Sequence, residues 1–194
     1  MGRTPNPDLR SARARRAILD AAVELGTRDG YAQVTVEAIA ARAGVGKQTI
    51  YRWWPRKSAV LLEALNERSG PAAEVPDTGD LAADLGRQLR MVIGLLNGDL
   101  GLIWRGLLAD AQSDACLAQE LRDNFFTPRL RRWRDRLETA VAAGELRADV
   151  PSATMVELLF GPVYYRYLIG TSPLDADDAE ALIEQIFNGL RPRP

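Results

Sequence analysis

The feature that most constrains this chain is the stretch 36–54, in which two short helical patterns flank a tight turn at Gly44-Val45-Gly46. The second pattern carries side chains that can bond to a phosphate or to the edge of a base, namely Lys47, Gln48, Thr49, Tyr51 and Arg52. Two helices joined by a short turn with glycine, the second with a polar face, are typical of a helix-turn-helix. The stretch therefore predicts DNA binding.

Each polar residue of the second pattern has a role that fits the major groove. Lys47 begins the helix, where a cation opposes the helix dipole, and a nearby phosphate would compensate for that. Gln48 can bond to adenine, and Thr49 can donate to a phosphate or contact a thymine methyl group. Ile50 must point into the three-helix core. The alternative, a generic polar surface, does not account for the spacing or for the turn.

The periodicity of the whole chain predicts an all-α fold, because helical patterns recur from end to end and no stretch alternates like a strand. In the first third, Thr35 is expected to cap a helix that ends at Gly44, and Tyr31 is expected to fold back onto the core. Thr127-Pro128 either begins a helix or kinks a longer one. The predicted helices cover residues 11–29, 35–44, 47–53, 57–68, 80–97, 99–112, 115–126, 127–144, 152–169 and 175–190.

Residues 70–79 contain two prolines and two glycines and are expected to form a linker. We therefore predict two domains, at 1–68 and 80–194. Residues 1–68 hold twelve Lys/Arg and seven Asp/Glu, which gives a net charge of +5, and the remainder has a net charge of −6. A basic first third suits a nucleic-acid module. Its first residues form a basic arm that can lie along phosphates or enter a minor groove, with Arg3, Arg10, Arg13, Arg15 and Arg16.

Composition excludes several classes of function. The chain has no His and a single Cys, Cys116, so His-based triads, His-containing metal sites and internal disulfides are absent. We predict no enzyme activity, no cofactor and no metal. No long apolar run or secretory signal is visible, which predicts a cytoplasmic protein with no membrane partner. An ordinary thiol is the expected state of Cys116, with a redox role as the alternative.

These residues carry a family resemblance. The pattern Thr35, Ile39-Ala40, Ala43-Gly44-Val45, Gly46, Thr49-Ile50-Tyr51, Trp53-Trp54 and Lys57 resembles the DNA-binding domain of the TetR family of transcriptional regulators. The resemblance covers about residues 11–68. It implies that Thr35, Lys47, Gln48, Thr49, Tyr51, Trp53 and Lys57 lie at the DNA, with Tyr51 and Lys57 on phosphates. The chain departs from the family at Gly46, often Ser, at Trp53, often His or Tyr, and at Arg56, often Ser or Asn.

The resemblance implies that the C-terminal helices bind a small effector and form a homodimer. The residues support an effector site independently, since aromatic side chains gather in a helical domain and suit a planar or hydrophobic ligand. Pro162 also leaves the carbonyl of Leu158 without its usual helical donor. A packed aromatic core is the alternative. The predicted ligand-binding residues are Trp104, Leu108, Phe125, Phe126, Trp133, Leu158, Tyr164 and Tyr165.

The last two predicted helices carry apolar stripes that can form a four-helix bundle across a two-fold axis. The predicted dimer residues are Val156, Phe160, Val163, Ile183, Phe187 and Leu190. In the alternative, the stripes pack within their own subunit. The sequence thus predicts a repressor released from a palindromic operator by a small hydrophobic or aromatic effector. Two rivals stay open: a DNA-binding dimer without an effector, and a helical enzyme, for which no spacing of titratable residues gives support.

Overall fold

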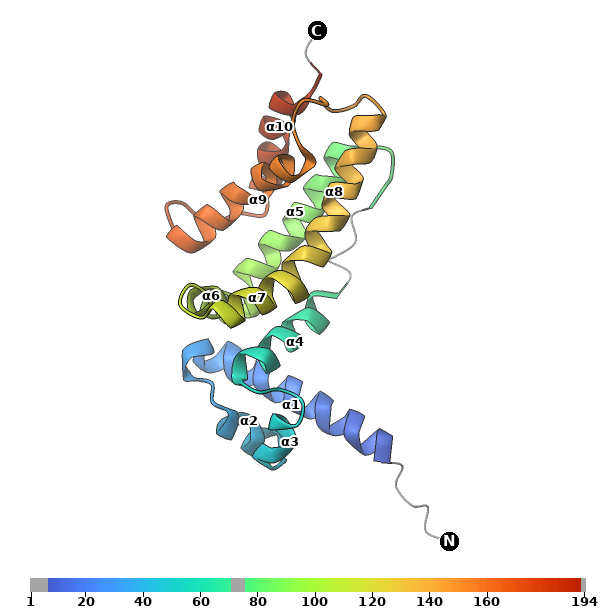
Figure 1. Cartoon of the computed structure of the whole chain (residues 1–194). Coiled ribbons are helices and arrows are strands. Elements are labelled where there is room, and N and C mark those ends of the chain that lie inside the picture. The colour runs from blue at the N-terminus through green and yellow to red at the C-terminus, as the bar shows by residue number, and fades with distance from the viewer. Residues whose placement is uncertain (1–6, 71–75, 193–194) are drawn as a thin grey trace. The chain divides into compact units, whose positions relative to one another are not determined.

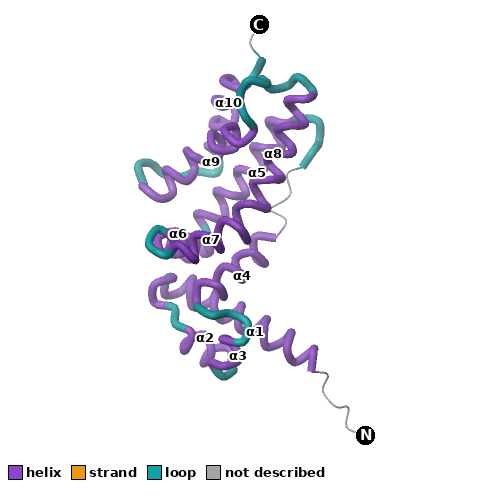
Figure 2. Tube along the Cα trace, viewed as in Figure 1, coloured by secondary structure: helices purple, strands orange, loops and turns teal. Residues whose placement is uncertain are grey.

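The computed structural model of the chain describes residues 7–70 and 76–192, and within these ranges it contains helices and loops but no strand (Figure 1). The all-α prediction is confirmed (Figure 2). The elements are α1 (Pro7–Asp29), η1 (Tyr31–Gln33), α2 (Val36–Ala43), α3 (Lys47–Tyr51), α4 (Lys57–Ser69), α5 (Leu81–Asn97), α6 (Asp99–Ala111), α7 (Ala115–Leu121), η3 (Arg122–Phe126), α8 (Thr127–Ala142), α9 (Ser152–Ile169) and α10 (Asp178–Leu190).

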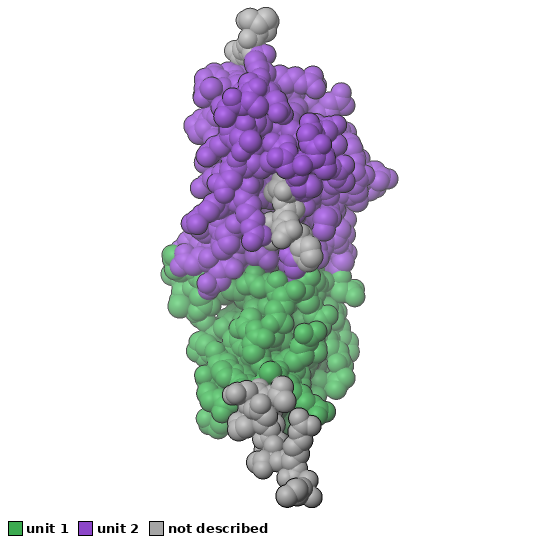
Figure 3. All heavy atoms as spheres, turned by 90° about the vertical axis from the view of Figure 1, so that its right-hand side faces the viewer, with its two compact units in different colours: residues 1–68, 99–121 green, residues 69–98, 122–194 purple. Residues whose placement is uncertain are grey.

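The helices divide into two compact units that do not follow chain order (Figure 3). Unit 1 comprises residues 1–68 and 99–121, and unit 2 comprises residues 69–98 and 122–194. Helices α6 and α7 thus belong to the same unit as α1, α2, α3 and most of α4, although they follow the predicted linker. Half of the predicted linker 70–79, namely residues 71–75, lies outside the described residues. The division into domains at 1–68 and 80–194 stays a prediction.

Unit 1 is built around α1, which packs against α2 and α6. The buried side chains of α1 include Ile18 and Ala22, and the other helices of the unit contribute buried Ile39, Leu61 and Ile103. Close packing depends on two glycines. A Cβ on Gly26 would lie 2.7 Å from the Ile103 side chain, and one on Gly106 would lie 2.3 Å from that of Tyr31. Any larger residue at either position would push α6 away from α1 or η1.

Unit 2 consists of α5, α8, α9 and α10 with η3, and its core is aliphatic and aromatic. The ring of Trp133 in α8 lies 4.8 Å from that of Phe160 in α9. Asp84 of α5 is fully buried and accepts hydrogen bonds from the backbone N–H (2.8 Å) and the hydroxyl (2.7 Å) of Thr78. Its burial is tolerable because these donors and the guanidinium of Arg87 satisfy the carboxylate.

Several predicted helix boundaries differ from the structure, and two of the differences concern the arrangement around α3 and α8. The stretch 115–126 is not one helix, since α7 ends at Leu121 and a turn of π-helix covers 122–126. Pro128 then lies in the first turn of α8, where its missing N–H costs no hydrogen bond. Helix α3 ends at Tyr51 rather than at 53, and beyond it the N–H groups of Trp53 and Trp54 share the carbonyl of Ile50 at 2.9 Å.

The predicted dimer residues lie mostly inside the single chain, and their part in a dimer stays a prediction. Five of them are buried within unit 2: Val156, Val163, Ile183, Phe187 and Leu190. Phe160 is half-buried against Trp133. The exposed apolar residues of α9 are others, chiefly Leu158 (44% exposed), Tyr165 (58%) and Ile169 (65%), which recur on one face at intervals of seven and four.

Candidate DNA-binding surface

The turn between α2 and α3 is closed by backbone geometry. Gly44 adopts a left-handed conformation (φ +66°), and the N–H of Val45 reaches back to the carbonyl of Ala40 at 3.0 Å. At the other end of α2, Thr35 accepts a hydrogen bond from the N–H of Ala38 at 3.1 Å. Both caps confirm the predicted ends of this helix. They leave a short connection before α3 begins at Lys47.

The orientation of α3 follows from one residue. Ile50 is fully buried, so the opposite face of this single-turn helix must point outward. Lys47, Gln48 and Tyr51 are exposed, Tyr51 by 46%, and Thr49 is half-buried. Arg52 is exposed just after the helix. The five side chains predicted to reach phosphates or bases therefore lie on or beside one accessible face.

A carboxylate compensates for the cation at the start of α3. The ammonium of Lys47 lies 3.0 Å from Oε1 of Glu37 in α2. The hydrogen bond between the two groups raises the pKa of Lys47 and lowers that of Glu37. The sequence suggested a phosphate as the compensating group, but in the free protein Glu37 has that role.

The tryptophan pair after α3 anchors this helix, which we call the reading helix, to the rest of unit 1. Trp54 is buried, and its indole N–H donates to Oε2 of Glu63 in α4 at 2.5 Å. The same carboxylate binds the guanidinium of Arg15 from α1, which also pairs with Glu67 at 2.7 Å. Trp53 is half-buried and packs edge-on against Trp54 at 5.4 Å. The exit of α3 is thereby tied to α1 and α4.

Lys57 and the basic arm make contacts that sequence reasoning missed. The ammonium of Lys57 donates to the carbonyls of Tyr31 (3.0 Å) and Ala32 (3.2 Å) and lies 4.6 Å above the Tyr31 ring. Lys57 therefore stabilises η1 in the free protein, whatever it does on DNA. Arg15 pairs with two carboxylates of α4 and is not part of an open arm, whereas Arg13 is exposed. Arg3 lies outside the described residues.

Three of the predicted ligand-binding residues contact one another within unit 2. In unit 2, Phe126 contacts both Phe125 (centroids 5.6 Å apart) and Tyr164 (6.2 Å), and the guanidinium of Arg129 lies 3.8 Å above the Phe125 ring. Burial lowers the pKa of Arg129. Trp133 is buried nearer Phe160. Of the remaining predicted residues, Leu158 and Tyr165 are exposed, and Trp104 and Leu108 belong to unit 1.

The described residues contain no group of three or more acidic or cysteine side chains able to hold a metal ion. No single helix among them is long and apolar enough to cross a membrane, and α5 and α6 reach that threshold only when they are taken together.

A helical unit with a buried Ile50 behind an exposed, polar second helix defines a helix-turn-helix DNA-binding protein. Comparisons with known proteins give the particular family. Residues 18–64 match the model of bacterial regulatory proteins of the tetR family, and residues 75–186 match that of the tetracyclin repressor-like C-terminal domain. The chain belongs to the TetR family of DNA-binding transcriptional regulators.

The similarity to known transcriptional regulators extends over nearly the whole length of both chains. The HTH-type transcriptional regulator YdeS of Bacillus subtilis is 34% identical over 91% of this chain and 89% of its own. The DNA-binding transcriptional repressor TetR of Mycobacteroides abscessus is 28% identical over 88% and 90%. The crystal structure of the TetR family regulator SCO0332 is 36% identical, covers 92% of this chain and 99% of its own, and superposes with a TM-score of 0.78. These proteins are regulators, not enzymes.

Proposed function

We propose that this chain is a homodimeric repressor that binds a palindromic operator through α3 and is released by a small effector bound in its C-terminal half. The observation that carries the DNA-binding part is the outward face of α3, with Lys47, Gln48 and Tyr51 exposed over a buried Ile50. Repression is supported by a relative named as a repressor. We expect the protein to act in the cytoplasm, where its DNA lies.

Dimerisation follows from the size of the reading helix. A helix of five residues contacts few bases and binds weakly alone, whereas two such helices about 34–36 Å apart meet successive major grooves. We assign the partner surface to the exposed row of α9, defined by Leu158, Gly161, Tyr165, Leu168 and Ile169. A Cβ on Gly161 would meet nothing within 4 Å, so a second helix can approach closely there.

The effector is proposed to bind at the aromatic group of unit 2, where Phe125, Phe126 and Tyr164 meet beside Arg129. Two proteins with the same fold but only 22–23% identity were crystallised with ligands as different as choline and stearoyl-CoA. The fold alone therefore sets no ligand class. The alternative is a dimer whose C-terminal half binds no effector.

A mobility-shift assay tests DNA binding. The probe is a duplex selected by the wild-type protein from a random-sequence pool. Tyr51→Ala and Lys47→Ala should each weaken binding at least about fivefold, because a lost contact to a base or phosphate costs about 1–3 kcal/mol. Their circular dichroism should match the wild type, since both side chains are exposed. Arg28→Ala is the matched control, because Arg28 is an exposed cation paired with its neighbour Asp29. Unchanged binding by Tyr51→Ala and Lys47→Ala would contradict the assignment.

A further inference from the structure

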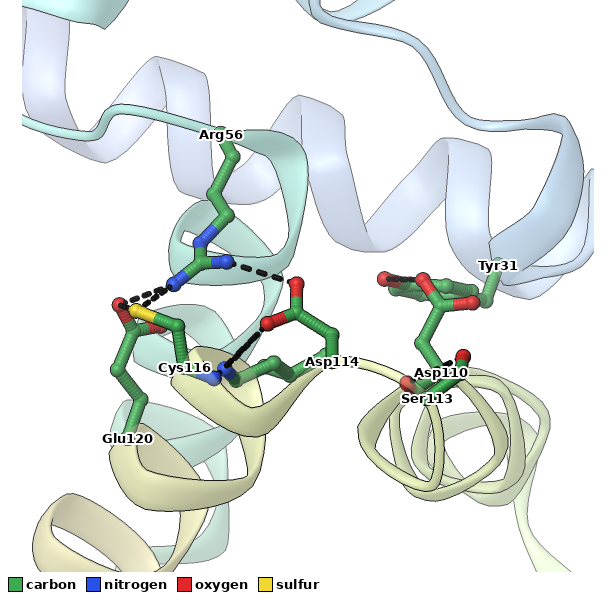
Figure 4. Close-up of polar contacts among 8 residues, drawn as sticks. Tyr31, Arg56, Asp110, Ser113, Asp114, Cys116 and Glu120 are labelled. Carbon is green, nitrogen blue, oxygen red and sulfur yellow. Dashed lines mark hydrogen bonds and ion pairs between the residues drawn. The ribbon is translucent and has the colours of Figure 1, made fainter.

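The segment that leaves α3 meets a polar cluster at the α6–α7 turn, within unit 1 (Figure 4). Arg56 immediately precedes α4. One of its terminal nitrogens donates to Oδ2 of Asp114 at 2.9 Å, and the other donates to Oε1 of Glu120 at 2.7 Å and to Sγ of Cys116 at 2.8 Å. One guanidinium therefore joins three residues of the α7 region. We call Arg56, Asp114, Cys116 and Glu120 the Arg56 clamp.

The clamp has the geometry of a stable contact. The side chains of Arg56 and Glu120 are only 28% and 27% exposed, so their attraction is less screened than that of a surface pair. The hydrogen bond to Glu120 is the main cause that raises the pKa of Arg56. Only a planar guanidinium can address Asp114 and Glu120 from two separate nitrogens, and the ammonium of Lys lacks that fork.

The α7 end of the clamp is fixed. Oδ1 of Asp114 accepts hydrogen bonds from the backbone N–H groups of Cys116 and Leu117, both at 3.0 Å, and so caps α7. These bonds, with that to Leu117 foremost, lower the pKa of Asp114. Its second oxygen is the one that binds Arg56. On the far side of the turn, the hydroxyl of Tyr31 donates to Asp110 at 2.6 Å. The turn is thus held at two points.

The segment that connects α3 to Arg56 is short. Ile50 accepts the N–H groups of Trp53 and Trp54, and Arg56 follows after one proline. Only five residues thus separate Ile50, the buried anchor of α3, from Arg56. Because Pro55 has a restricted backbone, little slack remains between them.

We propose that Arg56 is a positioning residue for DNA binding, which fixes the exit of α3 to the α6–α7 turn so that DNA affinity depends on where that turn lies. The inference rests on the proposed DNA-binding role of α3. It gives a specific route by which a displacement of α6 or α7 reaches the reading helix, and it runs through a residue that departs from the family pattern.

A double-mutant cycle separates this role from a direct phosphate contact. Arg56→Ala is compared in the wild-type background and in the double variant Asp114→Asn with Glu120→Gln. This double variant lacks both carboxylates of the clamp, and we call it the acid-free background. Its asparagine side-chain oxygen at position 114 can still cap α7. Affinity for the selected duplex is measured from 50 to 200 mM salt. We expect Arg56→Ala to weaken binding about tenfold, within the range of typical coupling between sites, and to leave the salt slope unchanged. In the acid-free background the loss should disappear.

Two results would overturn the proposal. An equal loss in both backgrounds, with a salt slope reduced by about 0.9, would mean that Arg56 contacts a phosphate directly. No loss in either background would mean that the clamp does not act on DNA binding. The variant Arg56→Lys, which keeps the charge but not the fork, should behave like Arg56→Ala if positioning matters, and like the wild type if only charge does.

Amide hydrogen exchange tests the clamp without DNA. In the free protein, Arg56→Ala and the acid-free variant should both speed exchange in residues 47–56 and leave α1 unchanged. If Arg56→Ala does not fold, the acid-free variant alone serves, because its cap is kept. Unchanged exchange in 47–56 would contradict the positioning role. A wild-type protein that selects no duplex would contradict the proposed function instead, while exchange would still decide on the clamp.

Discussion

At the scale of single residues, one cation on the outward face of α3 is already paired in the free protein. Lys47 pairs with Glu37 at 3.0 Å, and both side chains are more than half exposed. Such a pair contributes little to stability, but it places a negative charge beside the groups that must meet phosphates. Binding therefore requires Lys47 to exchange a carboxylate for the DNA.

This exchange gives a prediction for Glu37→Gln. Removal of the carboxylate should tighten DNA binding several-fold at 50 mM salt, with a smaller gain at 200 mM, because salt screens exposed charges. The melting temperature should change little. Fluorescence anisotropy with labelled selected and scrambled duplexes measures both affinities. Asp29→Asn, which removes the exposed partner of Arg28, is the matched control and should have no effect. Weaker binding by Glu37→Gln would mean that Glu37 instead orients Lys47 productively.

Contacts between side chains that are far apart in the chain could not be predicted from the sequence. The outward display of Gln48 and Tyr51 follows from the helical period once Ile50 is placed inside. The contacts of Arg56 with Glu120, 64 positions away, depend on how α7 packs, and no local spacing encodes them. The same holds for Trp54, since nothing in the sequence distinguishes the buried tryptophan of the pair from the half-buried one.

At the scale of elements, caps were the most predictable feature. Thr35 and Gly44 end α2 as expected, because capping needs only local geometry. The predictions that differ from the structure at this scale have physical causes as well. The π turn at 122–126 keeps a helical pattern in the sequence, so its wider winding was invisible. Helix α9 is apolar around much of its circumference, so the pattern did not reveal which face turns inward.

The cap of α2 gives a prediction about Thr35. Thr35→Ala should destabilise the protein by about 1 kcal/mol. A loss of that size lowers the melting temperature by about 2–4 °C in a chain of this length. Thr35→Ser keeps an oxygen for the N–H of Ala38 and should lose much less. Thermal unfolding followed by circular dichroism checks both variants. Equal losses in the two would show that the methyl group, rather than the hydroxyl, supports the helix.

At the scale of the whole molecule, the proposed dimer depends on the exposed row of α9. Tyr165→Glu should give monomers by light scattering while the fold is kept, because the ring is 58% exposed in one chain. Phe187→Glu should instead unfold unit 2, since Phe187 is buried and a carboxylate there has no partner. Thr139→Glu on the exposed side of α8 is the control and should stay dimeric. A dimer that persists in Tyr165→Glu would move the interface to another surface.

The central claim is that the α3 helices of two copies read two half-sites, and hydroxyl-radical footprinting on the selected duplex tests it most directly. The account predicts two protected half-sites related by a dyad, with centres about one turn of DNA (10–10.5 base pairs) or a multiple of it apart. Protection should vanish at both half-sites in Tyr51→Ala. A single protected site, or protection unchanged by Tyr51→Ala, would contradict the account.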